Sequence, residues 1–332
     1  MRFVCYDALE PAAQQQLGVE IFGVIYNLPT LVKQVATVTN LPAPPPPHTI
    51  WEYHALPQEQ KQQLTALVQA LPELLPEQRG ALIQSHVRRL PPVSAPHALR
   101  CFSTFEEHTK IVRQRRGLSM PTEWYEMPVF FFGNHNALYG HGAEIPQPAS
   151  FWLDYEMQVA CVIGQQGRNI PAAEAETYIA GYTILNDWCA RDLEMFEMKM
   201  GLGPAKGRDF ATSVGPTLVT PDELESYAIG DGAQRRYDLT LEASINGQIL
   251  GNTQSANLSA MHFTFAQMIE YASTDAMLYP GDILASGAVP GGSLLSIGAE
   301  EMLGRWLQPG DVVDLEATGL GVLRNTVTTP QV

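Results

Sequence analysis

The chain has 332 residues, of which 45% are hydrophobic and 17% are charged, as in ordinary globular proteins. The formal net charge of −15 argues against nucleic acid and anionic membrane as partners, and no apolar run approaches the roughly 20 residues needed to span a bilayer. The first residues lack a basic region followed by an apolar stretch, so we expect no signal peptide and a cytoplasmic protein. The four cysteines are scattered and indicate neither a disulfide framework nor a zinc site.

The first third of the chain mixes short strands with helices. Apolar residues from position 57 recur at i, i+3, i+4 and i+7, which predicts an amphipathic helix. The expected elements are strands at 2–7 and within 18–29, a Pro-rich extended connector at 41–48, and helices from 57 and within 76–90. The segment "PPVSAPH" then marks a boundary. We predict a small N-terminal α/β domain over 1–95 and a second domain over 96–332.

The second domain has a different composition. A helix over 104–117 is expected to end at Gly117, and its basic run is either a substrate clamp or a solvated helix face. Short β-branched segments separated by Gly and Pro follow, with an Asn-Gly hairpin turn at 246–247. Further helices are expected only at 171–180, 222–227 and 264–273. Many strands with few helices predict a mainly β domain.

The segment "LDYEMQVACVIG", residues 153–164, reads as a strand with a polar start. Side chains alternate between the faces of a strand, so one face carries an unbroken apolar row. The other face begins with Asp154, Glu156 and Gln158 before it becomes apolar. These polar residues indicate either a sheet with one solvated face or a metal or catalytic site. The strand alone leaves both interpretations open.

Three further motifs occur in order along the second domain: "NDWCARD", "GPAKGRDFATSVGP" and "GLGVLRNTV". With "LYPGDILASG" between the last two, the chain from about residue 100 to 327 resembles the fumarylacetoacetate hydrolase family. The resemblance implies an α+β, mainly β fold, a β-roll of stacked sheets that follows the small N-terminal domain. It also implies a homodimer and an active site that holds Mg²⁺, Mn²⁺ or Ca²⁺. Such an ion would stabilise the enolate of a 1,3-diketone or acylpyruvate.

The resemblance implies a metal site whose ligands are partly replaced. Family members hold the ion with an Asp, a Glu-x-Glu pair on a strand and a second Asp. The matching residues here are Cys101, Glu156, Gln158 and Asp187. Only Glu156 and Asp187 remain carboxylates, so Cys101 and Gln158 are weak candidate ligands. Hard dications depend on oxygen ligands and their charge, which a thiol does not supply.

The resemblance also implies catalytic and substrate-binding residues. The candidate catalytic residues are His108, Lys206 and Glu156, for proton transfer and oxyanion stabilisation. The candidate substrate-binding residues are Arg116, Phe131, Arg191, Glu194 and Ala288. Two further departures concern this pocket: Ala288 replaces a family Thr, and Ser296 falls near the Glu that partners the catalytic His. These changes indicate a site with altered chemistry.

Three interpretations follow. The first is an enzyme that acts on a small dicarbonyl-like molecule by acid/base chemistry without a resident metal, giving isomerisation, cyclisation, decarboxylation or dehydration. The second is a carbon–carbon bond hydrolase that uses weakly held Mg²⁺ or Mn²⁺. The third is a non-catalytic binding protein on the same fold. Each has a small-molecule ligand and the expected homodimer in common, with no nucleic acid or membrane partner.

Overall fold

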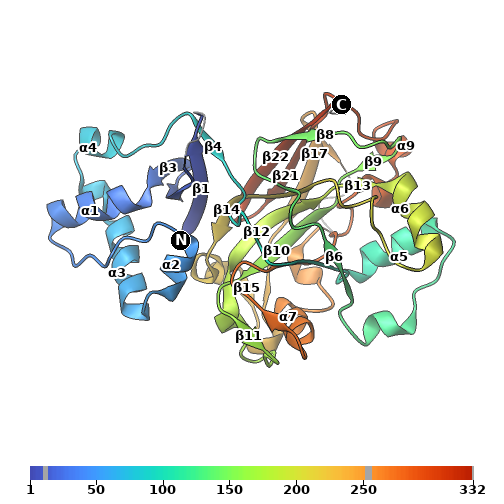
Figure 1. The fold of residues 1–332 in the computed structure, drawn as a ribbon, viewed down its shortest axis with the longest axis horizontal. Coiled ribbons are helices and arrows are strands. Elements are labelled where there is room, and N and C mark those ends of the chain that lie inside the picture. The colour runs from blue at the N-terminus through green and yellow to red at the C-terminus, as the bar shows by residue number, and fades with distance from the viewer. Residues whose placement is uncertain (10–13, 251–255, 331–332) are drawn as a thin grey trace.

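The computed structural model describes residues 1–9, 14–250 and 256–330. Its largest element is an 11-stranded sheet that extends from the N-terminal strands through the centre of the molecule (Figure 1). Nine of its strands follow one another as β3 (Val24–Asn27), β2 (Gln16–Ile21), β1 (Arg2–Ala8), β14 (Thr212–Val219), β12 (Ile179–Asp187), β10 (Met157–Ile163), β20 (Ile283–Ala285), β5 (Leu99–Phe102) and β6 (Phe130–Gly133). The strands β4 (Val87–Arg89) and β7 (Leu138–Tyr139) pair with β1 and β14.

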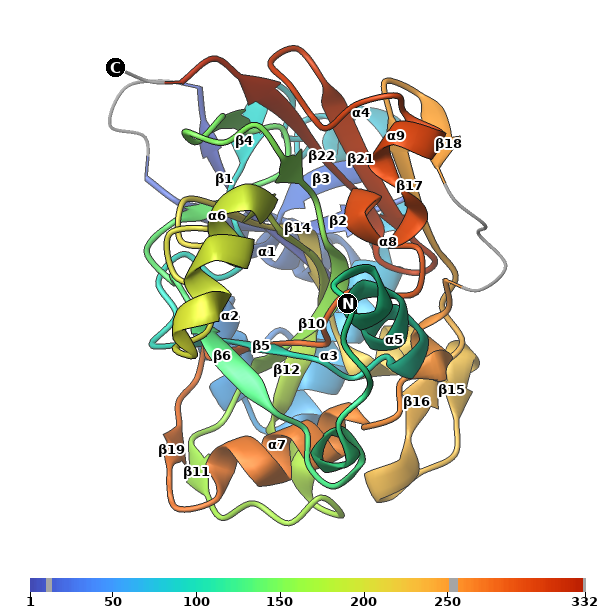
Figure 2. The same ribbon diagram turned by 90° about the vertical axis from the view of Figure 1, so that its right-hand side faces the viewer.

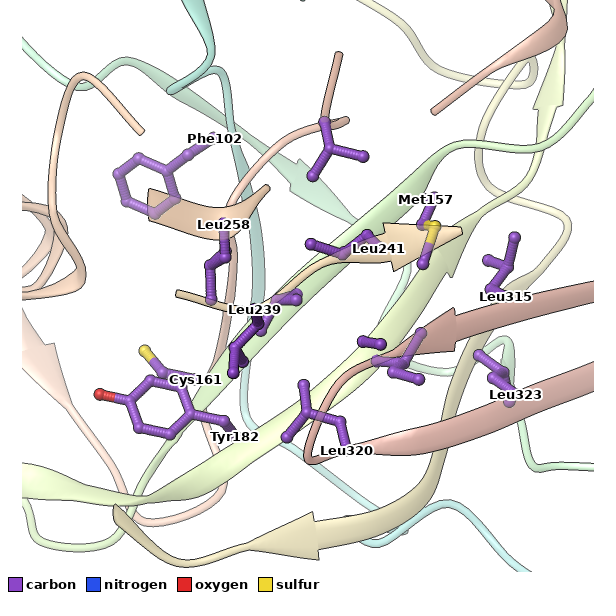
Figure 3. Close-up of a cluster of buried hydrophobic side chains, with 14 of the residues drawn as sticks. Phe102, Met157, Cys161, Tyr182, Leu239, Leu241, Leu258, Leu315, Leu320 and Leu323 are labelled. Atoms are coloured by element: carbon purple, nitrogen blue, oxygen red, sulfur yellow. The ribbon is translucent and has the colours of Figure 1, made fainter. Parts of the chain in front are cut away.

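A second sheet of five strands packs against one face of the large sheet. Its order is β18 (Gln248–Leu250), β17 (Leu241–Ile245), β21 (Val312–Ala317), β22 (Gly321–Thr328) and β8 (Glu144–Pro146). Buried apolar side chains fill the space between the two sheets (Figure 3). They include Met157, Cys161 and Tyr182 from the large sheet, and Leu241, Leu315 and Leu323 from the small one. This stacking confirms the predicted mainly β architecture.

The first three helices of the chain cover the opposite face of the large sheet. The α-helices are α1 (Leu28–Thr39), α2 (Ile50–Ala55), α3 (Gln58–Gln69), α4 (Pro76–Gly80), α5 (Glu106–Arg115), α6 (Arg191–Glu197), α7 (Phe265–Ser273), α8 (Leu294–Ile297) and α9 (Ala299–Met302). The first three contribute Leu31, Tyr53 and Leu64 to a second buried cluster. That cluster also contains Val162 and Leu185 from the central strands. Strands β10, β12 and β14 are therefore buried on both faces, which explains their continuous apolar composition.

Three small sheets and several 3₁₀ turns complete the fold. The small sheets pair β9 (Leu153–Asp154) with β13 (Cys189–Ala190), β11 (Gly167–Arg168) with β19 (Met277–Leu278), and β15 (Ala228–Ile229) with β16 (Arg236–Tyr237). The 3₁₀ turns are η1 (Leu71–Glu73), η2 (Thr122–Tyr125), η3 (Ala175–Tyr178), η4 (Met198–Met200), η5 (Pro221–Tyr227), η6 (Gly232–Gln234) and η7 (Leu258–Ala260). The helices expected at 171–180 and 222–227 are thus 3₁₀ turns. The helix at 264–273 and the Asn-Gly turn are confirmed.

The helix expected within 76–90 is mostly wrong. Only Pro76–Gly80 is helical, and none of its side chains is buried, so no apolar face stabilises a longer helix. The chain then joins the edge of β3 instead, because Ile83 bridges Tyr26 and the amide of Gln84 donates to the carbonyl of Ile25 at 2.8 Å. It continues extended into β4.

The large sheet crosses the predicted domain boundary. Strand β1 pairs antiparallel with β14, with Arg2 opposite Val219 and Phe3 opposite Leu218. The N-terminal strands therefore extend the sheet of the second region and do not form a sheet of their own. The division into 1–95 and 96–332 stays a prediction about folding units. Among the described residues, no helix combines the length and the apolar character of a membrane span.

Candidate active site

A cavity of about 240 Å³ lies between α5, α6 and the start of β10. Figure 2 shows α5 and α6 on the side of the molecule that faces the viewer, with β10 and β12 behind them. The volume of the cavity is below the range of pockets for drug-sized ligands, so the cavity suits a small metabolite. The charged residues of the lining, with His108 and Gln158, come from α5 and its C-cap, from β10 and the residue before it, from α6 and from the loop before β14: His108, Arg113, Arg116, Glu156, Gln158, Arg191, Glu194 and Arg208.

Glu156 and Asp187 lie next to each other because β10 and β12 are paired strands. The register places Met157 opposite Asn186, so Glu156 and Asp187 meet at the same end of the pair. The amide of Glu156 donates to the side chain of Asn186 at 3.0 Å. Glu156 is 6% and Asp187 2% exposed, and all of β10 is buried. The interpretation of this strand as part of a sheet with one solvated face is therefore wrong.

The guanidinium of Arg208 bridges these two carboxylates. Its Nη1 donates to Glu156 Oε2 at 2.7 Å and to Asp187 Oδ2 at 2.6 Å, and its Nη2 donates to Glu156 Oε1 at 2.8 Å. Its Nε and Nη2 also donate to Glu194 Oε1 at 3.2 and 2.9 Å. The ring of Phe131 lies 5.4 Å from the guanidinium carbon, a cation–π distance. Three carboxylates and one aromatic ring therefore fix the position of the Arg208 guanidinium.

The loop that carries Arg208 is fixed against α6. A Cβ on Gly207 would lie 2.7 Å from the backbone nitrogen of Glu194, so only glycine permits this approach. The carboxylate of Glu197 accepts hydrogen bonds from the amides of Lys206 and Gly207 at 2.7 and 3.1 Å. The Lys206 side chain points away from the cavity, is 75% exposed and pairs with Asp209 at 2.8 Å.

A second arginine completes the network from α6. Arg191 contacts Asp154 Oδ2 through Nε and Nη2, each at 2.8 Å, and Nη2 also lies 2.8 Å from Glu156 Oε1. Its Nη1 donates to Glu194 Oε2 at 3.0 Å. Arg116 from α5 reaches the same oxygen of Glu194 at 3.2 Å. Each of these charges has an opposite partner, which buried charges require.

The network holds three arginines and four carboxylates, and their pKa values follow from that arrangement. Burial disfavours ionised Glu156 and Glu194, but the charges of Arg208 and Arg191 outweigh burial and lower both pKa values, that of Glu194 to about 2. For Asp187, burial and the neighbouring Glu156 outweigh Arg208 and raise the pKa to about 6. Asp187 therefore binds a proton more readily than an ordinary Asp.

His108 lies on the inner face of α5 beside this network. It is 8% exposed, and its Nδ1 has no hydrogen-bond partner among the described residues. Burial lowers the pKa of His108 to about 4, assisted by the charges of Arg191 and Arg208 and opposed by that of Glu156. The imidazole is therefore neutral at pH 7 and has a lone pair available to accept a proton.

The residues expected to hold a metal ion can be tested against this geometry. Ligand atoms of Glu156, Asp187 and Cys189 lie within 4.8 Å of one another. However, the Glu156 and Asp187 oxygens already accept hydrogen bonds from Arg208, and Gln158 turns its Nε2 toward Glu156 Oε2 at 3.3 Å. A thiol is also a poor ligand for Mg²⁺. In this arrangement the donor set fits a guanidinium better than a hard dication.

The structure brings most of the predicted site residues to one place. His108, Arg116, Phe131, Glu156, Gln158, Arg191, Glu194 and Ala288 line the cavity. Asp187 and Cys101 do not line it, and burial raises the pKa of Cys101, which keeps it a neutral thiol. Lys206 lies outside, so its predicted place at the reacting groups is corrected: Arg208 occupies that position. Its catalytic role stays a prediction without support from its location.

Sequence reasoning did not identify Arg208, and it noted Asp154 on the polar face of the strand without giving it a role. The signal for Arg208 was present, because it lies two residues beyond Lys206 in the same glycine-rich loop. Asp154 lies two residues before Glu156, on the same polar face of the predicted strand. Its carboxylate accepts hydrogen bonds from the amides of Leu294 and Leu295 at 2.7 and 3.1 Å. It holds both Arg191 and the start of α8 in place.

The site and the fold define an enzyme-like cavity in a stacked-sheet protein, and the comparisons identify its family. The sequence model described as fumarylacetoacetate (FAA) hydrolase C-terminal matches residues 98–328. The chain belongs to the fumarylacetoacetate hydrolase family. It is 31% identical over 248 residues to the mitochondrial oxaloacetate tautomerase of Rattus norvegicus, covering 74% of this chain and 70% of that protein.

Other relatives and solved structures agree with this family. An uncharacterized protein of Pyrococcus abyssi is 35% identical over 63% of this chain and 83% of its own length. The fumarylacetoacetate hydrolase of Exiguobacterium antarcticum has the same fold, with a TM-score of 0.68 at 23% identity over 99% of both chains. The 5-carboxymethyl-2-hydroxymuconate delta-isomerase of Mycobacterium smegmatis gives 0.61 at 22% identity over both complete chains. The predicted fold is confirmed.

Proposed function

We propose that this protein is an acid/base enzyme that moves a proton on a small enolisable 2-oxo acid or 1,3-dicarbonyl compound. The observation that carries the proposal is the guanidinium of Arg208 between Glu156 and Asp187, beside the neutral His108. A guanidinium supplies a fixed positive charge where relatives with a metal would place their cation. The reaction class is isomerisation, of which keto–enol tautomerisation is the simplest case, and it needs no resident metal.

The proposed step uses His108 as the base. Its neutral imidazole takes a proton from the carbon next to the carbonyl, and the electron pair moves onto the carbonyl oxygen. Guanidinium N–H groups at the cavity wall stabilise the resulting enolate oxygen by hydrogen bonding. Return of the proton from the imidazolium to that oxygen gives the enol, so atoms and charge balance. Because a 1,3-dicarbonyl carbon is acidic, a base with a low pKa suffices.

The relatives support the same reaction class. The rat protein is named an oxaloacetate tautomerase, a name that denotes keto–enol interconversion of a 2-oxo acid. The proposal extends that name to this chain only as a class, an enolisable 2-oxo acid. A second candidate, a metal-dependent carbon–carbon hydrolase, is favoured by one observation, the close approach of Glu156, Asp187 and Cys189.

The two candidates differ in metal need and in products. Chelator-treated protein is given oxaloacetate and, separately, an acylpyruvate, with keto–enol conversion followed by ultraviolet absorbance and products by NMR. We expect conversion of one carbon skeleton without added metal, and its loss in His108→Asn. Two fragments that form only with Mn²⁺ would establish the hydrolase instead. Binding without any conversion would leave a binding protein on an enzyme fold.

A further inference from the structure

We propose that Arg113 determines substrate specificity by binding the distal carboxylate of a dicarboxylic 2-oxo acid. The inference rests on the function proposed above and names the substrate class for it. It assigns the role of substrate clamp to one residue of the basic run of α5, a run for which the sequence favoured a solvated helix face.

Arg113 is the uncommitted arginine of the cavity. Three others line the wall, and each contacts at least one buried carboxylate at 3.2 Å or less: Arg116, Arg191 and Arg208. No Asp or Glu among the described residues forms an ion pair with Arg113. Its Nε donates to the backbone carbonyl of Ser119 at 2.6 Å. That bond orients the guanidinium, while Nη1 and Nη2 have no acceptor within the described parts of the chain.

The position of Arg113 on α5 fits a ligand that also reaches His108. Residues His108, Thr109, Val112, Arg113 and Arg116 line the cavity together, the spacing of one helix face. The axial rise from His108 to Arg113 is about 7.5 Å for five residues. A short dicarboxylate can therefore place its central carbon near the imidazole and its far carboxylate near Arg113. The cavity volume of about 240 Å³ admits such a molecule.

The distribution of charge around the cavity also favours Arg113 as the residue that binds the distal carboxylate. The inner arginines face Asp154, Glu156, Asp187 and Glu194, so their positive charge is already compensated. A second anion placed there would compete with these carboxylates. The whole protein, at −15, also repels anions, which makes a local free cation necessary for a dianionic substrate. Arg113 supplies that cation, and guanidinium binds carboxylate in a planar, two-bond geometry.

The test compares two substrates with the same four-carbon chain, oxaloacetate and 2-oxobutyrate, which lacks the distal carboxylate. Exchange of the C3 hydrogens in D₂O is followed by NMR for wild type, Arg113→Gln, Arg113→Lys and the control Arg115→Gln. Arg115 is exposed, lies two residues away and does not line the cavity. Each variant is compared with wild type on the same substrate, so the different acidities of the substrates cancel.

We expect Arg113→Gln to raise the KM for oxaloacetate about 10- to 100-fold with little change in kcat, as loss of one charge-assisted contact predicts. The constants for 2-oxobutyrate should change less than about twofold. Arg113→Lys should recover part of the loss, and Arg115→Gln should match wild type. Equal losses on both substrates, or none on oxaloacetate, would overturn the role of Arg113.

A binding measurement separates this inference from the proposed function. Calorimetry with 2-oxoglutarate and 2-oxobutyrate requires no turnover. If wild type exchanges neither substrate, the proposed function fails. The specificity role then stands only if 2-oxoglutarate binds more tightly than 2-oxobutyrate and Arg113→Gln removes that difference. If Arg113→Gln binds 2-oxoglutarate as tightly as wild type does, the specificity role fails whatever the activity.

Discussion

Arg208 Nη1 lies 2.6 Å from Asp187 Oδ2, so a cationic side chain touches a carboxylate expected to be a metal ligand. The positive charge of this site is therefore covalently part of the chain. A bound ion contributes to stability according to its concentration, whereas this charge is always present.

Arg208→Met should destabilise the protein by about 3–5 kcal/mol, because it leaves Asp187 buried without a counter-charge and Glu156 with Arg191 as its remaining partner. Millimolar Mn²⁺ or Mg²⁺ should raise the melting temperature of this variant, since the two carboxylates become available as ligands. Differential scanning fluorimetry with and without the ion measures both effects. A variant as stable as wild type would show that the bridge contributes little.

The matched control for that variant is Arg324→Met. Arg324 also contacts a carboxylate in two-bond fashion, Asp314, at 2.6 and 2.7 Å, but its side chain is 58% exposed. An exposed ion pair contributes about 0–1 kcal/mol. We therefore expect a small change in melting temperature and no response to added ions.

Wild-type protein should respond weakly to divalent ions. The oxygens that would bind an ion accept hydrogen bonds from Arg208, so an ion must displace a guanidinium that is itself costly to leave unpaired. We expect a melting temperature that barely changes in millimolar Mg²⁺ and tautomerase activity that survives EDTA. Stoichiometric metal retained after dialysis would contradict this prediction.

Asp187 should give the protein an unusual dependence of stability on pH. Burial raises its pKa from 3.8 to about 6, so the folded state binds this proton more tightly than the unfolded chain does. The contribution of this bound proton to the free energy of unfolding is complete below pH 3.8 and is lost as the pH rises through 6. Relative to Asp187→Asn, wild type should lose about 2–3 kcal/mol between these limits. Urea unfolding of both proteins at pH 4 and 7 measures the difference.

The activity should fall at low pH because of His108. A base must be neutral to accept a proton, and the pKa of this imidazole is about 4. We expect kcat/KM to decrease as the pH falls through that value, well below the range of an ordinary histidine. His108→Asn should lose at least about 100-fold in kcat at pH 7 while its melting temperature changes little. A decrease of kcat/KM centred near pH 6.5 would show that another residue is the base or that the imidazole of His108 is exposed.

The homodimer expected from the family is also open to test. Phe151, Phe196 and Leu202 are 89, 70 and 91% exposed in the single chain, which is unusual for large apolar side chains. Light scattering should give a particle of twice the 36.5 kDa chain mass. A 36.5 kDa particle at all concentrations would refute the dimer.

The site could be predicted from sequence as far as strand neighbours determine it. Glu156 precedes an apolar strand, Asp187 ends one and His108 lies in a predicted helix, so family spacing pointed to all three. Lys206 was predicted in place of Arg208, because both lie in an irregular loop with no periodicity to distinguish them. Which side chain points inward depends on the amides of Lys206 and Gly207 binding the carboxylate of Glu197, a contact that no local pattern encodes.

The fold shows a similar division. The mainly β character, the Asn-Gly hairpin and the helix at 264–273 followed from local chemistry. The helix α1 was missed, although Asn27 caps it by accepting the amide of Thr30 at 3.1 Å and Asn40 ends it in the left-handed region. Its start coincides with the end of a strand, and the β-branched residues before Asn27 concealed the change of period.

The pairing of β1 with β14 crosses the boundary at which the family match begins. The family match begins at residue 98, yet the partner of Val219 and Leu218 is at the very start of the chain. A fragment that begins at residue 96 would leave part of β14 as a free strand edge next to uncovered apolar side chains, and such edges aggregate. Domain shuffling at this boundary would therefore require a new element to cover β14. In the folded chain the N-terminal strand β1 covers this edge of β14.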